Sequence, residues 1–281
     1  MNNQQRGQEA LQQLDRALRG RDRAEKTKPL MVVLMAAVAI LVLVGGIVYA
    51  ATRDGGDTSA EGSTDTSVDE LPTPEILAMS RETPLENTVT CEYPDSGEAA
   101  KQVSKPQTKD VPTTGTATVT LNTSQGEIGL ELDRSVSPCT VNAITHLAKE
   151  KYYDDTVCHR MTNDGIYVLQ CGDPSGSGAG GPGFSFADEY PTDSPEGEET
   201  RVTYPRGSLA MANSGPDTNG SQFFLNYQDS PLPPAYTYFG QINDKGLETL
   251  DKIAENGITP GASPNDGAPA EEVKITSATV S

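Results

Sequence analysis

The stretch that decides the fold is SLAMANSGPDTNGSQFFLNY, residues 208–227. Two apolar runs, SLAMAN and SQFFLNY, flank a segment rich in Asn, Ser, Gly, Pro, Asp and Thr. This pattern predicts two strands joined by a turn-rich loop. Phe223 and Phe224 are neighbours on the second strand, where successive side chains point to opposite faces. We therefore expect one ring in the core and the other, with Gln222, on the outer face.

Similar patterns continue along residues 114–281. Apolar and polar residues alternate on both sides of the turn at Ser124–Gly126, which is a hairpin signal. Amphipathic spacing predicts helices over residues 137–155 and 245–256. Further strands are expected at TVCHRM, IYVLQCGD, YTYFGQIN and EEVKITSATV. About eight strands and two helices predict a mainly β fold, a closed eight-stranded antiparallel barrel capped by two α-helices.

Charge is distributed unevenly along the 281 residues. The net charge is -19, which argues against a nucleic-acid partner, because the phosphate backbone attracts basic surfaces. Residues 1–50 hold seven Lys/Arg and four Asp/Glu, whereas the remainder holds 14 and 36. This asymmetry indicates that the two parts of the chain occupy different environments.

Residues 30–52 contain no charged side chain and are long enough to cross a bilayer as one helix. Six Lys/Arg lie between Arg16 and Lys28, and Arg53 is the only basic residue close behind. That bias predicts a single-pass signal-anchor with a cytoplasmic N-terminus and an extracytoplasmic C-terminal part at the cell membrane. The alternative is a signal peptide cleaved near Ala50, although the apolar run is longer than such peptides usually have.

Three further segments complete the organisation. Residues 1–29 are a polar cytoplasmic tail in which Leu11, Leu14 and Leu18 have helical spacing. Residues 53–113 form an extracytoplasmic stalk rich in Pro, Thr and acidic residues. Its first part, to residue 85, has the composition of a disordered segment. The later part contains Cys91 and could be strapped to the folded domain at 114–281 by a disulfide.

The four cysteines are Cys91, Cys139, Cys158 and Cys171, all in the part expected outside the cell. An even number in an oxidising compartment favours disulfides, with three possible pairings. Zinc is the alternative, but no close cysteine pair or histidine-rich cluster supports it. We therefore expect no metal.

Several kinds of chemistry lack their motifs. GSGAGG at 176–181 fits a dinucleotide-binding pattern, but Pro182 and a strand-like run follow it instead of a helix. There is no Walker loop and no G-x-S-x-G nucleophile elbow. His146 lies on an apolar helix, where a packed histidine is the simpler interpretation. These observations predict no cofactor and favour a site that holds a peptide, although Arg160 by itself could be an ordinary surface cation.

Three segments carry a family resemblance: CHRMTNDGIYVLQCGDPSGSGAGGPGFSFADE, GSLAMANSGPDTNGSQFFLNY and YTYFG. Residues 116–281 resemble the cyclophilins, the cyclophilin-type peptidyl-prolyl isomerases. With the anchor and stalk, the chain looks like the membrane-tethered extracytoplasmic cyclophilins of actinobacteria. The resemblance implies a barrel with a substrate groove on its outer face, X-Pro segments of exported or unfolded polypeptides as partners, and no cofactor.

The resemblance also assigns roles within this sequence. Arg160 corresponds to the catalytic arginine, His159 lies at the edge of the site, and Gln170 orients the arginine. The other substrate-binding positions comprise residues that grip the peptide backbone and residues that form the walls of the proline pocket. They are Ala212, Asn213 and Gln222 for the backbone, and Phe224, Leu232, Tyr236, Tyr167 and Val168 for the pocket.

The sequence departs from the family pattern in four respects. The loop Thr162–Gly165 is about two residues longer than usual. Tyr167 replaces a pocket phenyl ring in an uncertain register. The chain has no Trp, and family members without the pocket-edge Trp bind cyclosporin poorly, so we expect weak inhibition. Cys171 replaces a glycine on a strand expected to pair with that of Cys158, which favours Cys158–Cys171 and leaves Cys91–Cys139.

The resulting functional hypothesis is a peptidyl-prolyl cis-trans isomerase that assists the folding of exported proteins by non-covalent stabilisation of the twisted X-Pro amide. The main alternative is a non-catalytic cyclophilin-like chaperone or proline-peptide-binding module. A structural wall-associated protein, with the acidic stalk as its main feature, is a third interpretation.

Overall fold

The computed structural model describes residues 74–192 and 201–281. Within them, β4 (Thr116–Thr123) and β5 (Gly126–Asp133) form the hairpin that the sequence predicts, paired from Thr116 opposite Asp133 to Thr123 opposite Gly126. Ala117, Val119 and Leu121 are buried, and the residues between them are more exposed. The alternating pattern of this hairpin therefore marks the side of the strand that faces the core.

The described part of the chain contains an 11-stranded sheet in the order β14-β15-β7-β8-β11-β10-β13-β5-β4-β16-β6. Its connected strands pair antiparallel throughout. The strands expected from the sequence are confirmed except that TVCHRM, expected as one strand, is divided into β6 and β7. The hairpin of β14 and β15 was not predicted. Besides β4 and β5, the members are β6 (Thr156–Val157), β7 (Arg160–Thr162), β8 (Val168–Cys171), β10 (Ser208–Met211), β11 (Phe223–Asn226), β13 (Tyr238–Ile242), β14 (Ile258–Ser263), β15 (Asp266–Pro269) and β16 (Lys274–Val280).

The prediction of a closed eight-stranded barrel is wrong, because the strand order of the described sheet has two ends, β14 and β6. Only Cys158 and His159 separate β6 from β7, and the hydrogen-bonding partner changes there. β6 pairs with β16, whereas β7 pairs with β8 and β15. The chain itself, rather than a ladder of hydrogen bonds, therefore connects β6 at one end of the sheet to β7, the third strand from the other end.

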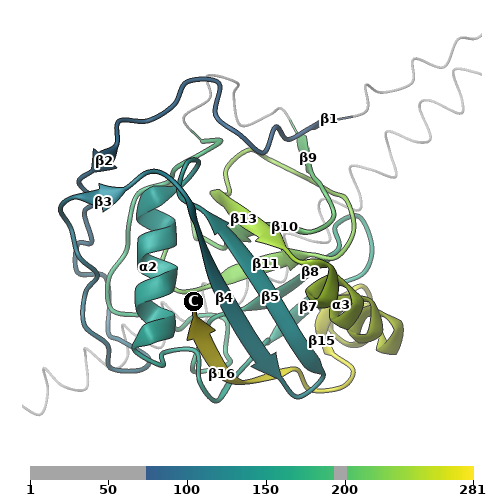
Figure 1. Cartoon of the computed structure of the whole chain (residues 1–281). Coiled ribbons are helices and arrows are strands. Elements are labelled where there is room, and N and C mark those ends of the chain that lie inside the picture. Colours follow the sequence, from purple (N-terminus) through teal and green to yellow (C-terminus); the bar gives the residue numbers. More distant parts are fainter. Residues whose placement is uncertain (1–73, 193–200) are drawn as a thin grey trace, which may run out of the picture. The chain divides into compact units, whose positions relative to one another are not determined.

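The two predicted helices are confirmed as α2 (Pro138–Lys149) and α3 (Asp244–Asn256), and Figure 1 shows them on either side of the β4–β5 hairpin. The Asn243 side chain caps α3 by accepting from the Gly246 N–H at 2.8 Å. Ser137 does not cap α2, because its hydroxyl donates to the carbonyl of Tyr238. The buried carboxylate of Glu189 caps α2 instead.

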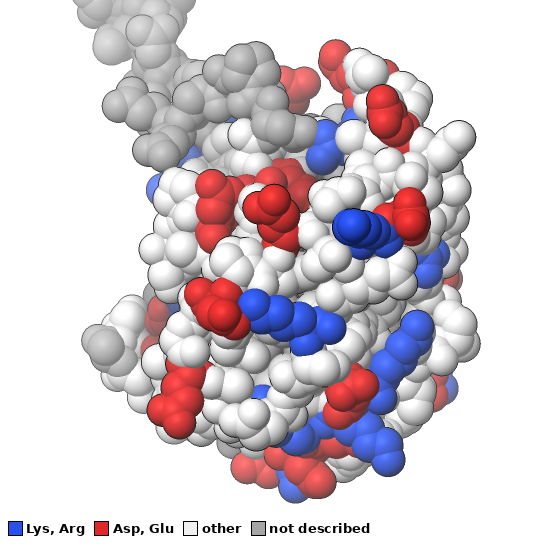
Figure 2. Space-filling model, turned by 90° about the vertical axis from the view of Figure 1, so that its left-hand side faces the viewer, with Lys and Arg blue, Asp and Glu red and all other residues white. Residues whose placement is uncertain are grey.

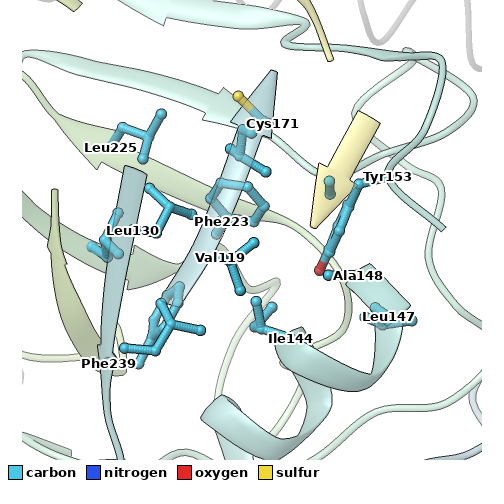
Figure 3. Close-up of a cluster of buried hydrophobic side chains, with 14 of the residues drawn as sticks. Val119, Leu130, Ile144, Leu147, Ala148, Tyr153, Cys171, Phe223, Leu225 and Phe239 are labelled. Atoms are coloured by element: carbon cyan, nitrogen blue, oxygen red, sulfur yellow. The ribbon is translucent and has the colours of Figure 1, made fainter. Parts of the chain in front are cut away.

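The main core lies between α2 and the inner face of the sheet (Figure 3). Ile144 and Leu147 of the helix are buried together with Val119, Leu130 and the rings named in the figure. Burial of such side chains contributes roughly 1.5–3 kcal/mol each to folding. This core holds the sheet rigid, so that residues on its outer face keep their relative positions.

Residues 74–113, here called the strap, run across the outside of this domain (Figure 1). Cys91 is joined to Cys139 of α2, and the buried Tyr93 hydroxyl donates to the Cys139 carbonyl at 2.8 Å. Residues 74–85, assigned to the stalk from composition, are also held against the domain. The strap contributes three short strands, which pair with each other or with β9 (Val202–Tyr204), itself paired with β12 (Ser230–Leu232): β1 (Glu75–Ile76), β2 (Thr88–Val89) and β3 (Val111–Pro112).

Figure 2 shows the side of the molecule on which β2 and β3 lie in Figure 1, with acidic and basic side chains interspersed over it. Within the strap, Lys105 pairs with Asp95 at 2.7 Å. Opposite charges this close partly cancel each other's field.

No helix within residues 74–192 and 201–281 has both the length and the apolar character needed to span a membrane. The predicted anchor at 30–52, the tail at 1–29 and the first part of the stalk, to residue 73, lie outside the described residues.

Candidate functional site

Three adjacent strands bring the polar residues singled out in the sequence into one row. Arg160 on β7 lies opposite Gln170 on β8, and Gln170 lies opposite Phe224 on β11. Side chains directly opposite each other on antiparallel strands share a face. The alternate residues Leu169 and Leu225 belong to the main core. Arg160, Gln170 and Phe224 therefore project from the outer face.

The Arg160 guanidinium is held by two partners. Its Nε and Nη2 donate to the two carboxylate oxygens of Asp266 at 2.8 and 2.7 Å, and its Nη1 donates to Gln170 Oε1 at 3.1 Å. A guanidinium has five N–H groups. Among the described residues, one N–H on each terminal nitrogen is therefore left without a partner. These two donors belong to a side chain that is 40% exposed and lines a cavity.

The same contacts keep the pair charged. The hydrogen bond to Asp266 raises the pKa of Arg160 above its ordinary value, more than burial lowers it. The hydrogen bond from Arg160 lowers the pKa of Asp266. Both shifts favour the ionised forms.

Asp266 was not found from the sequence, because it lies 106 residues after Arg160, on the β14–β15 hairpin. Register places it opposite Thr162. The inserted loop Thr162–Gly165 contacts the turn of this hairpin: the Asn163 N–H donates to the Asn265 carbonyl, and the Asn265 amide donates to Asp164. The inserted loop thus helps to hold Asp266 beside Arg160. The Asn-Asp-Gly run at 265–267 is the turn signal that would have indicated the hairpin.

A chain of amide groups continues from Arg160 along the outer face. Gln170 Nε2 donates to Gln222 Oε1 at 2.9 Å. Gln222 Nε2 donates in turn to the carbonyls of Gly178 and Gly180 at 3.0 and 2.9 Å. Both amide hydrogens of Gln222 therefore bind the segment 176–181, here called the glycine loop. Gln222 therefore orients Gln170, rather than offering N–H donors to a peptide as the resemblance implied.

The glycine loop is itself fixed by the buried Asp173. Its carboxylate accepts from the main-chain N–H groups of Ser175, Gly178 and Gly180 at 2.7, 2.7 and 3.0 Å. Burial alone would raise the pKa of Asp173, but hydrogen bonds from Ser175 and the two glycine N–H groups make the net shift downward. The G-x-G-x-x-G pattern in the sequence thus reflects a loop folded around a carboxylate.

Beside the guanidinium lies a cavity of about 140 Å³. Its apolar side belongs to a second hydrophobic cluster, separate from the main core. Phe224 is 5% exposed, and its ring meets Tyr236 edge-on with centroids 5.5 Å apart. The lining residues are Arg160, Ile166, Val168, Gln170, Ala212, Asn213, Phe224, Leu232 and Tyr236. A small cavity with this mixture of apolar and polar lining residues suits a ligand that has an apolar ring and a polar group on one side of it.

Asn213 uses its side chain locally, because its Nδ2 donates to the Ala235 carbonyl at 2.8 Å and its Oδ1 accepts from the Gly215 N–H. Its main-chain N–H and C=O make no hydrogen bond with other described residues. These groups border the cavity and are available to a bound peptide. The sequence interpretation assigned this role to the backbone at Asn213.

Two residues predicted for the site do not line this cavity: Tyr167 lies away from it, and His159 lies at its edge, in a hollow that shares Arg160 and Gln170. Tyr167 packs on Tyr227, with ring centroids 5.9 Å apart, and Ile166 takes the place in the cavity that was expected for Tyr167. Ile166 and Val168 both line the cavity, and because successive side chains of an extended segment point to opposite faces, Tyr167 between them points away. His159 lines a different hollow, shared with Arg160 and Asp266. Burial and then the neighbouring Arg160 charge lower its pKa, although Asp173 opposes this.

A disulfide joins Cys158, two residues before Arg160 in the chain, to Cys171, which directly follows Gln170. This is the pairing favoured from the sequence. It connects the β6–β7 junction to the end of β8. Within residues 74–192 and 201–281, no group of three or more His, Cys, Asp or Glu side chains is arranged to hold a metal ion.

Comparison with known proteins matches residues 118–280 to the family described as cyclophilin type peptidyl-prolyl cis-trans isomerase/CLD. The chain is 53% identical over 196 residues to a "Probable peptidyl-prolyl cis-trans isomerase B" of Mycobacterium leprae, covering 67% of this chain and 66% of the relative. A protein of the same description from Mycobacterium tuberculosis is 52% identical over 194 residues, covering 66% and 62%. The match thus spans slightly less than two thirds of either relative.

Among solved structures, the chain is similar to a crystal structure of a cyclophilin type peptidyl-prolyl cis-trans isomerase from Cryptosporidium parvum. The sequence identity is 32% and the TM-score is 0.49, covering 59% of this chain and 98% of that one.

Proposed function

Because the chain belongs to the cyclophilin-type peptidyl-prolyl cis-trans isomerase family, we propose that it catalyses the cis-trans isomerisation of X-Pro bonds in polypeptides. The observation that carries the proposal is the pair of Arg160 N–H groups that have no partner among the described residues, at the edge of a small cavity floored by Phe224. The cavity accepts the proline ring, and Arg160 is the catalytic residue.

The reaction has a barrier of about 18–20 kcal/mol, because the amide nitrogen shares its lone pair with the carbonyl. When the bond is half turned, the nitrogen regains that lone pair and can accept a hydrogen bond. An Arg160 N–H then stabilises the twisted amide and not the planar ground state, which is selective binding of the transition state. One charged hydrogen bond contributes about 1.5–3 kcal/mol net.

The remaining stabilisation comes from holding the substrate. Phe224, Leu232 and Tyr236 grip the proline ring in a site with little water, while the free main-chain groups of Asn213 bind the peptide next to it. The ring stays still, and the carbonyl on its N-terminal side turns. Fixed donors in a partly dry site cost no reorganisation during this step. No bond is made or broken, and no cofactor is needed.

The experiment is Arg160→Ala in the purified full-length chain, with exchange of a prolyl peptide followed by NMR and, separately, by a protease-coupled assay. We expect the catalysed rate to fall at least about tenfold, because the transition-state hydrogen bond is lost. Arg206→Ala is the matched control, since Arg206 also pairs with a carboxylate, Asp251 at 2.9 Å, but does not line the cavity. An unchanged rate of catalysed exchange in the Arg160→Ala variant would contradict the mechanism.

One observation favours a second candidate, a non-catalytic peptide-binding module. Three of the five Arg160 N–H groups, and both Gln222 amide hydrogens, are already used inside the protein. A binding module would hold prolyl peptides with measurable affinity and leave their exchange rate at the uncatalysed value. Measuring peptide Kd and exchange on the same sample separates the two functions.

The proposal includes a location: the domain acts on exported or unfolded polypeptides outside the cell membrane, tethered by residues 30–52. The apolar run at 30–52, the basic residues before it and the two disulfides support this location. The test uses tags at both ends and protease added to intact protoplasts. We expect loss of the C-terminal tag and protection of the N-terminal tag, and protection of both before lysis would contradict the topology.

Because the chain has no Trp, we also expect weak inhibition by cyclosporin.

A further inference from the structure

A second and larger cavity adjoins the proline cavity. Its volume is about 460 Å³, and Gln170, Ala212 and Asn213 line both. These three residues therefore form the boundary between the two cavities. A peptide seated in the smaller one has a neighbouring side chain within reach of the larger one.

One wall of this larger cavity comes from outside the region that matches the family. Ser96, Gly97 and Glu98 of the strap line it, whereas the family match begins at residue 118. The strap is held here by main-chain hydrogen bonds: the Ser96 N–H donates to the Gly183 carbonyl at 3.0 Å, and the Ala100 N–H to the Gly181 carbonyl at 2.9 Å. The wall therefore comes from residues outside the region that matches the family model.

The strap segment is also anchored close to Glu98. Tyr93 is 4% exposed and meets Phe184 and Phe186 edge-on, with centroids 5.6 and 5.8 Å apart. The disulfide from Cys91 to Cys139 fixes the chain two residues earlier. Such anchoring restricts where the Glu98 backbone can move relative to the cavity.

The chemistry of the larger cavity points to a cationic ligand. Glu98 is the only ionisable side chain among its lining residues, which otherwise offer hydroxyl, amide and main-chain groups. Among the described residues Glu98 has no salt-bridge partner, whereas nearby Asp95 is neutralised by Lys105 at 2.7 Å. Lys101 on the same strap donates its ammonium to three main-chain carbonyls, among them that of Lys151.

We propose that Glu98 is a specificity-determining residue: from the strap wall of this cavity it selects a lysine or arginine side chain close to the isomerised proline. This inference rests on the proposed function of the adjoining site and adds a substrate class to it. In an extended peptide, side chains two positions apart share a face and lie about 6.5–7 Å apart along the chain. Because the two cavities share Gln170, Ala212 and Asn213, we assign the larger cavity to the residue two positions from the proline, on the same face of the peptide. The excess of 36 Asp/Glu over 14 Lys/Arg after residue 50 also favours the approach of cationic segments.

The experiment measures catalysed exchange, by NMR without a coupling protease, for two sets of proline peptides. One set carries Lys, Gln or Glu two residues before the proline, and the other carries them two residues after it. We expect the Lys peptide to exceed the Gln peptide in kcat/KM by about two- to fivefold at one of the two positions, as for a solvent-exposed ion pair. About 0.5 M NaCl should remove most of the difference, because salt screens exposed charges.

Variants of the full-length chain assign the effect to its source. Glu98→Gln should abolish the preference for Lys, and Glu98→Lys should reverse it, while the rate for the Gln peptide stays the same. Glu92→Gln is the matched control, since Glu92 is an exposed glutamate on the strap that does not line the cavity. Equal rates for Lys and Gln at both positions, or a preference that survives Glu98→Gln, would overturn the inference.

Failure of the proposed function gives a different result. In that case no peptide is isomerised by the unmodified chain, and the same peptides are compared by Kd. A tighter Kd for Lys that disappears in Glu98→Gln supports the subsite even without catalysis, and equal Kd values refute it.

Discussion

Asp266→Asn should lower the turnover of the proposed isomerisation by removing the acceptor that orients Arg160. The substitution keeps the size of the side chain, but its amide nitrogen cannot accept the hydrogen bond that Arg160 Nη2 now donates at 2.7 Å. Arg160 remains charged in either case, because a guanidinium does not lose its proton in proteins. The change therefore tests orientation and not charge on the arginine.

The size of the effect follows from the exposure of the pair. The Arg160 and Asp266 side chains are 40% and 39% exposed. Ion pairs exposed to water contribute about 0.2–1 kcal/mol, well below the roughly 1.5–3 kcal/mol of a charged hydrogen bond in the interior. Because a factor of ten corresponds to about 1.4 kcal/mol, the upper end predicts a fivefold loss in kcat, roughly. Peptide Kd should change little, since the cavity walls are untouched.

The assay combines NMR exchange at saturating peptide, which reports kcat, with a peptide titration, which reports Kd. Asp251→Asn is the matched control, because it breaks the Arg206–Asp251 pair away from the cavity. A thermal melt shows whether the β14–β15 hairpin stays docked. Equal or faster turnover in Asp266→Asn would refute the reasoning, since Asp266 would then oppose the arginine charge instead of aligning it.

Three further changes test other parts of the structure. The folded-state pKa of His159 is depressed below 6.5, so its contribution to stability is present above pH 6.5 and is lost as the pH falls through the folded-state pKa. His159→Asn should therefore flatten the decline of Tm with falling pH. An unchanged slope of Tm against pH would contradict this role of His159. Glu189→Ala leaves two N–H groups at the start of α2 without an acceptor, which should cost about 2 kcal/mol, or ~4–8 °C in Tm. Glu189→Gln should lose less, and equal Tm values for the unmodified chain and both variants would exclude the cap. Replacing Cys158 and Cys171 with Ser opens a cross-link that spans 13 residues and should cost about 3 kcal/mol in urea unfolding, and an unchanged midpoint would show that the bond adds nothing to stability.

Much of the fold could be predicted because its signals are local. The alternation along β4 and β5 and the helical spacing of α2 and α3 are each contained within a few residues. The row of Arg160, Gln170 and Phe224 also has a local cause, since each belongs to a short apolar run. Pairing of those runs is enough to bring them to one face.

The contacts that were missed depend on distant parts of the chain. Asp266 reaches Arg160 only because β15 pairs with β7, and Glu189 reaches α2 across about 50 residues. Neither contact has a signature in the neighbouring sequence. Ile166 lies in the cavity in place of Tyr167 because side chains alternate along the chain: Val168 lines the cavity, so Ile166 shares its face and Tyr167 does not. The open end of the sheet has the same kind of cause: β6 and β7 choose different partners across two residues.

The distribution of hydrogen bonds also limits what the site can do. Gln170, Gln222 and Asp266 are occupied with one another, with Arg160 or with the glycine loop. No carboxylate, imidazole, thiol or aliphatic hydroxyl lines the described proline cavity. Bond cleavage by nucleophilic or general-base catalysis needs such a group next to the reacting atom. The cavity offers apolar walls, two amide side chains, the Tyr236 phenol, main-chain groups and the N–H donors of Arg160. This set can stabilise a rotated amide, because that reaction requires a hydrogen-bond donor and a held ring but no proton acceptor.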